Sequence, residues 1–233
     1  MQKGTQKSVN KLGTRDEALF HIHDSSTLMF GGFGGIGNPP TLIEAILEKG
    51  IKDLTLIGND AAFPDIGIGR IVSRGLATKL IASHIGSNPV AGQLMTDGKL
   101  EVEFSPQGTL AERIRAGGVG LKGILVDVGL GSMVEEGKQK VMVDGKTCLL
   151  ETPLRAEVSI VYAKKADTFG NLVYDTSARN TSPLVAMAGD YTIAEVEEIV
   201  PAGELDPECV VTPGIFVDLI IQSKGVNWTW AWE

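Results

Sequence analysis

Short apolar runs alternate with helix-forming segments along the first half of the chain, and this alternation limits the fold more than any other feature. The strand-like runs span residues 27–30, 53–57, 79–83 and 100–104. Segments of helical character lie beside them, at residues 16–23 and 40–49 and again from Thr109. Repeated strand–helix–strand units fold into a mostly parallel sheet with flanking helices. The sequence therefore predicts an α/β fold.

The pattern changes after Gly129, where turn signals separate apolar alternations. Asp144-Gly145 lies between two such stretches, which is a strong hairpin signal. A second pair of strands is expected around Gly170-Asn171. We expect these antiparallel strands to be added to the parallel core. With 233 residues and no compositional break, the chain 1–233 is expected to form one domain, with residues 1–14 and 223–233 as peripheral tails.

Charge and apolar pattern exclude several classes of function. The net charge of −8 argues against binding to a phosphate backbone, so no nucleic-acid partner is expected. No apolar run approaches the roughly 18 residues of a membrane span, and the N-terminus has no apolar signal core, so no membrane association is expected. Cys148 and Cys209 lie far apart, in no metal-binding spacing. Two reduced thiols in a cytoplasmic protein are the expected state.

Residues 32–37, GFGGIG, match the G-x-G-x-x-G spacing of a dinucleotide-binding turn. The turn follows a strand, and Asp60 closes the next strand about where an acid would meet a ribose hydroxyl. However, Pro39 and Pro40 follow directly, and they remove backbone N–H groups and hold Asn38 away from helical geometry. Pro40 is better suited to open the next helix. A dinucleotide site, a loop that is glycine-rich for packing alone, and a site for another chemistry are all compatible with these residues.

Three other groups of residues favour structural roles. His21 and His23 form an H-x-H pair without a third ligand, so a helix end facing solvent is expected rather than a metal site. His84 follows the third strand and is expected to be a buried, hydrogen-bonded side chain rather than part of a pocket. The C-terminal tail places tryptophans at alternate positions, which an extended strand would present on one face, over a subunit contact or the core: Trp228, Trp230 and Trp232.

Two longer motifs resemble those of family I coenzyme A transferases. GGFGGIGNPP, residues 31–40, fits the family pattern GGF-x-x-x-G-x-P, and EFSPQGTLAERIRAGGVG, residues 103–120, is similar to the family's PQGTLAERIRAGG segment. Further matching stretches follow in order: LTLIGND, IASHIGSNP, VEEGKQ, LLETPLRAEVSIVYAKKADTFGNL, SARN and VTPGIFVD. The resemblance runs from about residue 15 to residue 222 and is strongest to α subunits of the acetate– or butyrate–acetoacetate type. It implies a CoA-transferase/NagB-like fold.

The resemblance further implies a ping-pong transfer of CoA between carboxylic acids through a glutamyl-CoA thioester. In two-subunit members the nucleophilic glutamate belongs to the β subunit, within a Ser-Glu-Asn-Gly-type motif. This chain has no Glu-Asn-Gly, and the nearest equivalent, Glu136 in VEEGKQK, is typical of a solvated turn. The implied partners are therefore a β subunit carrying the catalytic glutamate, in an α2β2 or larger hetero-oligomer, and acyl-CoA with short-chain carboxylic or 3-oxo acids. No cofactor is expected, because the CoA thioester is a substrate.

The resemblance also assigns residues of this half-site. Gln107 matches the glutamine whose side-chain amide forms part of the oxyanion hole, where a neutral donor stabilises negative charge without neutralising the attacking carboxylate. The alternative is a glutamine that caps the helix starting near Thr109. The residues expected to line the substrate and CoA pocket are Gly31, Gly32, Phe33, Gly34, Gly35, Gly37, Asn59 and Asp60. Phe33 has a core-filling alternative, and no metal ligands are expected.

Three positions depart from the family pattern. Thr181 and Ser182 stand in SARNTSP where related α subunits often carry an aromatic residue and an asparagine, and Asp127 adds a charge to the loop before Gly129. These changes leave Gln107 and the glycine loop untouched, so they concern acyl preference or a subunit surface rather than the reaction type. Two functions compete with the transferase: an NAD(P)-dependent oxidoreductase built on GFGGIG, and a non-catalytic binding or regulatory subunit.

Overall fold

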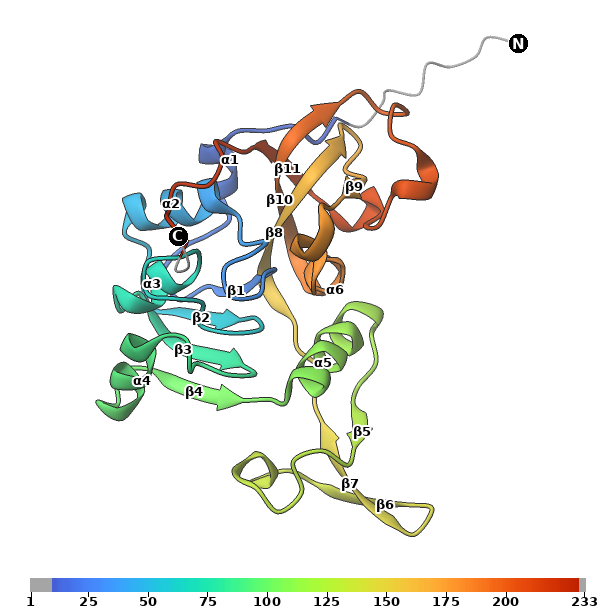
Figure 1. The fold of residues 1–233 in the computed structure, drawn as a ribbon. Coiled ribbons are helices and arrows are strands. Elements are labelled where there is room, and N and C mark those ends of the chain that lie inside the picture. Colours follow the sequence, from blue (N-terminus) through green and yellow to red (C-terminus); the bar gives the residue numbers. More distant parts are fainter. Residues whose placement is uncertain (1–9, 231–233) are drawn as a thin grey trace.

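A mostly parallel sheet forms the body of the protein (Figure 1). The structure, a computed structural model, describes residues 10–230. Seven strands run parallel in the order β11-β10-β8-β1-β2-β3-β4, and the short strand β9 (Leu172–Val173) pairs antiparallel with β8. The parallel strands are β1 (Thr27–Phe30), β2 (Leu54–Ile57), β3 (Ala77–Ala82), β4 (Glu101–Phe104), β8 (Ala156–Asp167), β10 (Gly189–Val200) and β11 (Leu219–Gln222). The predicted α/β fold class is confirmed.

Helices cover both faces of this sheet, so the strands alternate between two apolar cores. Leu28 and Leu56 pack in one core, with the four helices α1 to α4, whereas Met29 and Ile57 pack in the other, with α5 and α6. The helices are α1 (Arg15–Phe20), α2 (Pro40–Lys49), α3 (Gly69–Ser73), α4 (Pro89–Thr96), α5 (Gln107–Val119) and α6 (Ser182–Ala188). Single 3-10 turns are η1 (Met133–Glu135), η2 (Thr176–Arg179), η3 (Pro207–Cys209) and η4 (Gly214–Phe216).

The start of α2 is fixed by a carboxylate from a distant strand. Pro40 is the first residue of the helix, as the sequence predicts, and Pro39 before it has no side chain with which to cap the helix. Glu195, in the middle of β10 and fully buried, accepts hydrogen bonds from the backbone N–H groups of Thr41 (2.9 Å) and Leu42 (3.0 Å). The hydroxyl of Ser223 donates a third hydrogen bond to the same carboxylate. Glu195 therefore supplies the cap that the local sequence lacks.

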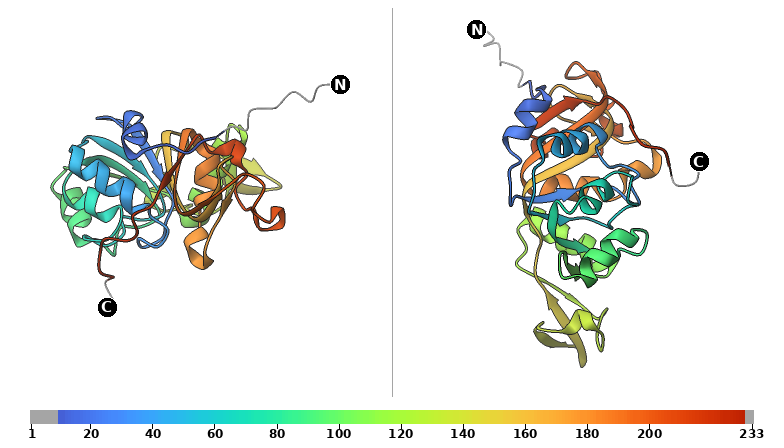
Figure 2. Two further views of the ribbon diagram at one scale, coloured as in Figure 1. Left: turned by 90° about the horizontal axis from the view of Figure 1, so that it is seen from above. Right: turned by 90° about the vertical axis from the view of Figure 1, so that its left-hand side faces the viewer.

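A second, smaller sheet extends away from the main one, at the end opposite to α1 (Figures 1 and 2). It contains β5 (Ile124–Val126), β7 (Lys146–Glu151) and β6 (Lys140–Val143), all antiparallel. Asp144 and Gly145 join β6 to β7 with positive φ angles of 49° and 75°, as a tight hairpin turn requires. The hairpin prediction is confirmed. Its strands form a sheet of their own, however, and only β9 is added antiparallel to the main sheet.

Both described ends of the chain pack against the body. Leu12 forms a parallel bridge with Ile220 beside β11, and the Lys11 ammonium donates to two backbone carbonyls, each at 2.7 Å. At the other end, the backbone N–H of Lys224 donates to the Thr41 hydroxyl on α2. The first predicted helix is shorter than expected, because α1 ends at Phe20. Among residues 10–230, no helix combines the length and apolar character needed to cross a membrane.

Candidate active site

The loops that follow β1, β2, β3 and β4 meet at one edge of the sheet, because parallel strands all end on the same side. In Figure 1 the arrowheads of β2, β3 and β4 point to this edge, toward α5. The loop after β1, residues 31–37, is called the glycine loop below. Asn59 and Asp60 follow β2, His84 follows β3, and Gln107 follows β4. The topology thus brings the main predicted site residues together.

Gln107 is the first residue of α5, yet its side chain does not cap the helix. No side-chain hydrogen bond caps this helix at Pro106, so the capping alternative is wrong. The Gln107 side-chain nitrogen Nε2 instead donates to Oδ1 of Asn59 at 2.9 Å. Gln107 is solvent-exposed. One N–H of its amide is therefore held by Asn59 at the sheet edge, and the residue as a whole is accessible to solvent.

Asn59 and Asp60 are buried, with 3% and 2% of their surfaces exposed. Nδ2 of Asn59 donates to Oδ2 of Asp60 at 2.7 Å, and the same oxygen accepts the backbone N–H of Gly34 at 2.9 Å. The other oxygen of Asp60 accepts the backbone N–H of Ala62 at 2.7 Å. These bonds form a continuous polar chain from Gln107 to the glycine loop. The two residues lie behind the loop, and their predicted pocket-lining role stays a prediction.

Most glycines of the loop are explained by contacts within this chain. A Cβ atom on Gly31 would lie 2.3 Å from the hydroxyl of Ser182, and one on Gly37 would lie 2.5 Å from the backbone carbonyl of Ala178. Gly32 and Gly35 are buried in the same way, against Asn38 and Ile66. Only at Gly34 (φ 59°) does a Cβ meet nothing nearer than 3.9 Å. Another molecule can therefore approach the loop backbone directly at Gly34. The predicted pocket role of the other four glycines remains a prediction.

The tip of the glycine loop separates two apolar hollows. Phe33 is 50% exposed and forms a bridge with Ile36, so it does not plug the core. The larger hollow, of about 310 Å³, is lined by Phe33, Gly34, Ile36, Phe63, His84 and Ser87. The smaller, of about 250 Å³, is lined by Phe33, Ile36, Ser177 and Asn180.

His84 corrects one prediction and Asn180 adds a residue that the sequence did not assign. His84 is exposed, and its ring centre lies 6.3 Å from that of Phe33, so the expected burial of this side chain is wrong. The side chain of Asn180 accepts the Gly32 N–H at 3.0 Å and donates to the Ile36 carbonyl at 3.1 Å. The only sequence signal for Asn180 is its place in the SARN stretch. Phe63, Ile36 and Ser87 carry no signal of their own.

The geometry does not support the dinucleotide alternative. The helix begins three residues after the last glycine of GFGGIG, at Pro40. Asp60 receives three N–H donors within this chain and so is not free to meet a ribose. Within residues 10–230, no group of three or more His, Cys, Asp or Glu side chains is arranged to hold a metal ion. His21 stacks on the Tyr191 ring at 3.7 Å, and His23 contacts Ser26.

The remaining predicted residues lie outside the hollows. Glu136 is exposed at the end of η1 and lines a different hollow, with Met133 and Lys138. Asp127 is exposed after β5. Ser182 is buried against Gly31, at the start of α6, so this departure from the family pattern contacts the glycine loop directly. Cys148 and Cys209 are free, as expected.

The tryptophan tail is only partly described. Trp228 and Trp230 belong to no strand, and their rings meet edge to face at 5.9 Å. The Trp230 ring lies 3.4 Å from the Cβ position of Gly35. The tail therefore reaches the glycine loop at Gly35, and the expected cover over a subunit contact or the core stays a prediction. Trp232 lies outside the described residues.

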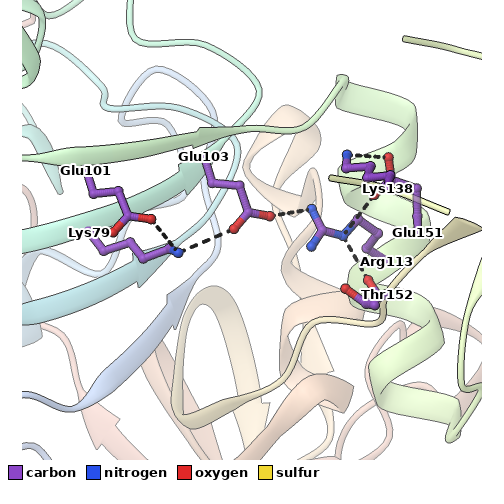
Figure 3. Close-up of polar contacts among 7 residues, drawn as sticks. All are labelled: Lys79, Glu101, Glu103, Arg113, Lys138, Glu151 and Thr152. Atoms are coloured by element: carbon purple, nitrogen blue, oxygen red, sulfur yellow. Dashed lines mark hydrogen bonds and ion pairs between the residues drawn. The ribbon is translucent and has the colours of Figure 1, made fainter. Parts of the chain in front are cut away.

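A chain of ion pairs beside the site ties α5 to its neighbours (Figure 3). Lys79 on β3 pairs with Glu103 on β4 at 3.5 Å, and Glu103 pairs with Arg113 on α5 at 2.9 Å. Arg113 also lies 3.8 Å from Glu151 on β7, which pairs with Lys138 at 2.6 Å. Arg113 and Glu151 have side chains only 5% and 1% exposed. This chain of charges fixes α5, and with it Gln107, against β4 and the small sheet.

The fold is that of an α/β protein in which strand-end loops, an amide donor and apolar hollows gather at one edge of the sheet, where open parallel sheets hold ligands. The coenzyme A transferase family profile matches residues 14–223. The chain therefore belongs to the coenzyme A transferase family, whose members transfer CoA, and it is of the α-subunit type.

Individual relatives agree with this assignment. A probable coenzyme A transferase subunit alpha of Bacillus subtilis (strain 168) is 60% identical over 94% of this chain and 96% of its own. The acetate CoA-transferase subunit alpha of Escherichia coli (strain K12) is 52% identical over 92% and 97%. The crystal structure of an acyl-CoA transferase apoenzyme from Escherichia coli O157:H7 shares the fold, with a TM-score of 0.82 and 24% identity. The superposition includes 97% of this chain and 51% of the acyl-CoA transferase chain, so this chain spans about half the length of that protein.

Proposed function

We propose that the chain is the α subunit of a transferase that exchanges CoA between acetoacetate and short-chain carboxylic acids such as acetate or butyrate. The observation that carries the proposal is the Gln107 amide, held at the carboxyl edge and linked by hydrogen bonds to the glycine loop. The acetate CoA-transferase relative supports acetate as one acid. A hollow of about 310 Å³ with apolar walls supports a short, uncharged acyl chain, because it lies near the lower limit of ligand pockets, roughly 300–1,000 Å³.

The proposed reaction is a ping-pong exchange. A glutamate carboxylate on a β subunit attacks the thioester carbon of the acyl-CoA and expels the CoA thiolate, which leaves a mixed anhydride. The thiolate then attacks the glutamyl carbon and releases the first acid, and the second acid reverses both steps. Negative charge develops on the carbonyl oxygen during each attack, and the Gln107 N–H stabilises that charge. The reaction needs no bound cofactor.

The proposed assembly follows from the missing nucleophile. The chain lacks Glu-Asn-Gly. Glu136 is exposed just after η1, and the hollow it lines contains neither Gln107 nor a residue of the glycine loop. A β subunit supplies the glutamate, in an α2β2 or larger hetero-oligomer in the cytoplasm. The sheet edge, the hollows and Gln107 form this chain's half of the site.

The first experiment measures CoA exchange between acetoacetyl-CoA and acetate, butyrate or succinate, with this chain alone and co-purified with a candidate β subunit. We expect activity only in the pair, with the covalent thioester trapped on the β subunit and with the two monocarboxylates preferred. Turnover by this chain alone would contradict the half-site proposal. Preference for succinate would contradict the proposed acid class but not the family.

Replacing Gln107 tests its role. In the complex, Gln107→Ala should lower kcat roughly a hundredfold, because removal of one oxyanion donor costs this much in other enzymes. The melting temperature should stay close to that of the parent, since the Gln107 side chain is exposed and does not cap α5. A variant that loses stability while kcat per folded protein is unchanged would assign Gln107 a structural role.

A further inference from the structure

We infer that Asp60, acting through Asn59, fixes the orientation of the Gln107 amide so that one N–H faces the reacting oxygen. This inference rests on the proposed function. Neither Asn59 nor Asp60 is a catalytic residue, because both are buried. They are positioning residues.

The chain of hydrogen bonds has a direction that begins at Asp60. A side-chain amide can face a neighbour with its oxygen or its nitrogen, and only the partners decide which. Asp60 receives N–H donors from Gly34 and Ala62 of the backbone and acts as an acceptor. Asn59 must therefore turn Nδ2 toward Asp60, at 2.7 Å. Its Oδ1 is then left facing Gln107.

The same rule fixes the next amide. Because Oδ1 of Asn59 only accepts, Gln107 must present Nε2 to it, at 2.9 Å. That nitrogen carries two hydrogens, and among residues 10–230 the amide makes no other hydrogen bond recorded in the structure. The second hydrogen is available to a substrate oxygen. If the Asn59 amide were reversed, its Nδ2 would face Gln107. Gln107 would then turn its side-chain oxygen toward Asn59 to accept that hydrogen bond, and its Nε2 would no longer be held.

Burial makes the orientation firm. Ser83 also holds Asn59, because its hydroxyl donates to the Asn59 backbone carbonyl at 2.7 Å and lies within 3.4 Å of Oδ1 as a second donor to that acceptor. Asn59 and Asp60 are buried, and a flip of the Asn59 amide would set its oxygen against the Asp60 carboxylate, acceptor against acceptor, so the pair resists rotation. A preorganised donor costs no reorganisation when charge develops, which is the property an oxyanion hole requires. Asp60 also anchors Gly34, so it sets the loop and the amide together.

The test is a double-mutant cycle in the complex with a β subunit. Asp60→Asn replaces one carboxylate oxygen, which accepts hydrogen bonds, by an NH2 group, which donates them. Asn59→Ala removes the amide that links Asp60 to Gln107, while Asp60 keeps its bonds to Gly34 and Ala62. Each is made alone and combined with Gln107→Ala, and kcat, KM and melting temperature are measured. We expect each single variant to lower kcat about tenfold or more with KM changed less than about twofold. In the Gln107→Ala background Asn59→Ala should lower kcat less than about twofold, because the group it positions is gone, whereas Asp60→Asn should keep only the part of its loss that comes through Gly34.

Asp167→Asn is the matched control. Asp167 is also buried, accepts loop N–H groups at residues 169–171, and accepts Nδ2 of Asn171 at 2.8 Å. It lies at the end of β8, outside the hollows beside Phe33. Its kcat should be unchanged in both backgrounds even where the melting temperature falls.

Equal losses of kcat in both backgrounds would overturn the inference, since Asp60 and Asn59 would then act independently of Gln107. If Asp60→Asn does not fold, Asn59→Ala carries the test alone. A Gln107→Ala variant with unchanged kcat would instead overturn the proposed role of Gln107, which the single variant reveals before the cycle is complete.

Discussion

Arg113 is a charged side chain with almost no access to water. It is 5% exposed on α5 and contacts Glu103 at 2.9 Å, Glu151 at 3.8 Å and the Thr152 carbonyl at 2.8 Å. Removing one partner of a buried ion pair leaves the other charge uncompensated, at a cost of about 3–5 kcal/mol. Arg113→Met should therefore lower the free energy of unfolding by about 3 kcal/mol, the lower end of that range, because Glu151 keeps Lys138.

Urea unfolding measures this change, and an exposed pair provides the control. Arg15 and Glu48 are 35% and 51% exposed, so Arg15→Met should cost less than about 1 kcal/mol. Equal losses for the two variants would show that the burial of Arg113 adds nothing to its contribution.

Glu195 makes a separate prediction about pH. Burial raises the pKa of this carboxyl above its ordinary value of 4.5, while the hydrogen bonds from Ser223, Leu42 and Thr41 oppose the rise. A raised pKa means that the folded state binds the proton more tightly than the unfolded state. The contribution of Glu195 protonation to the free energy of unfolding is fully present below pH 4.5. This contribution is lost as pH rises through the folded-state pKa. The variant Glu195→Gln does not show this loss, because glutamine does not titrate.

The free energy of unfolding of the parent and of Glu195→Gln should be compared by urea titration from pH 4 to pH 8. The parent should lose stability relative to the variant as pH rises above 4.5, whatever constant difference the lost cap introduces. Parallel curves over this range would contradict the pKa shift.

The strands of the first half were predicted closely, because each ends in a turn that the sequence marks. β1 spans residues 27–30 as expected, whereas β3 begins at Ala77, before the expected 79. β8 and β10 were not recognised as central parallel strands, since β8 joins the first half of the sheet only through β1, at the other end of the chain. Glu195 also interrupts the apolar pattern of β10 at a fully buried position. A residue that caps a distant helix gives no local sign of that role.

The C-terminal tail should brace the glycine loop from behind. Trp230 lies against Gly35 and Asn227 donates to Glu44 on α2 at 2.9 Å. Trp230→Ala should lower the free energy of unfolding by about 1–3 kcal/mol, less than for a fully buried tryptophan. It should also speed hydrogen exchange of the glycine loop. Val226→Ala, in the same tail and 47% exposed, should change neither quantity; an equal effect would assign the loss to the tail in general.

The small sheet should open independently of the main one. No residue of β5, β6 or β7 belongs to either apolar core of the described chain, and few of their side chains are buried. Elements with few buried contacts open locally at lower free energy than the global transition. Native-state hydrogen exchange should show β6 and β7 amides exchanging with little dependence on denaturant, and β1, β2 and β8 amides exchanging only with global unfolding. A single exchange free energy for both sheets would contradict this.

The sequence motifs and the ends of the predicted strands were enough to predict which residues gather at the site. The rule that parallel strands end together places Asn59, Asp60 and Gln107 on one edge without any coordinates. It cannot give the side-chain contacts, so the bond between Gln107 and Asn59 and the burial of Asp60 were not foreseen. The walls of the hollows come from loops whose packing depends on the whole fold. His84 was misjudged for that reason.

The order of strands in the sheet also has a consequence during synthesis. Strands β1 to β4 lie within residues 27–104, but β1 needs β8, which begins at Ala156, as its other neighbour. At about 5–20 residues per second, the ribosome takes roughly 3–10 seconds to extend the chain from the end of β4 to the start of β8. For that time the nascent chain presents an unpaired, apolar edge at Leu28 and Met29. The chain therefore exposes a surface for a binding partner before its synthesis is complete. Chaperones that bind unpaired strand edges should remain bound to ribosome-attached chains arrested before residue 156.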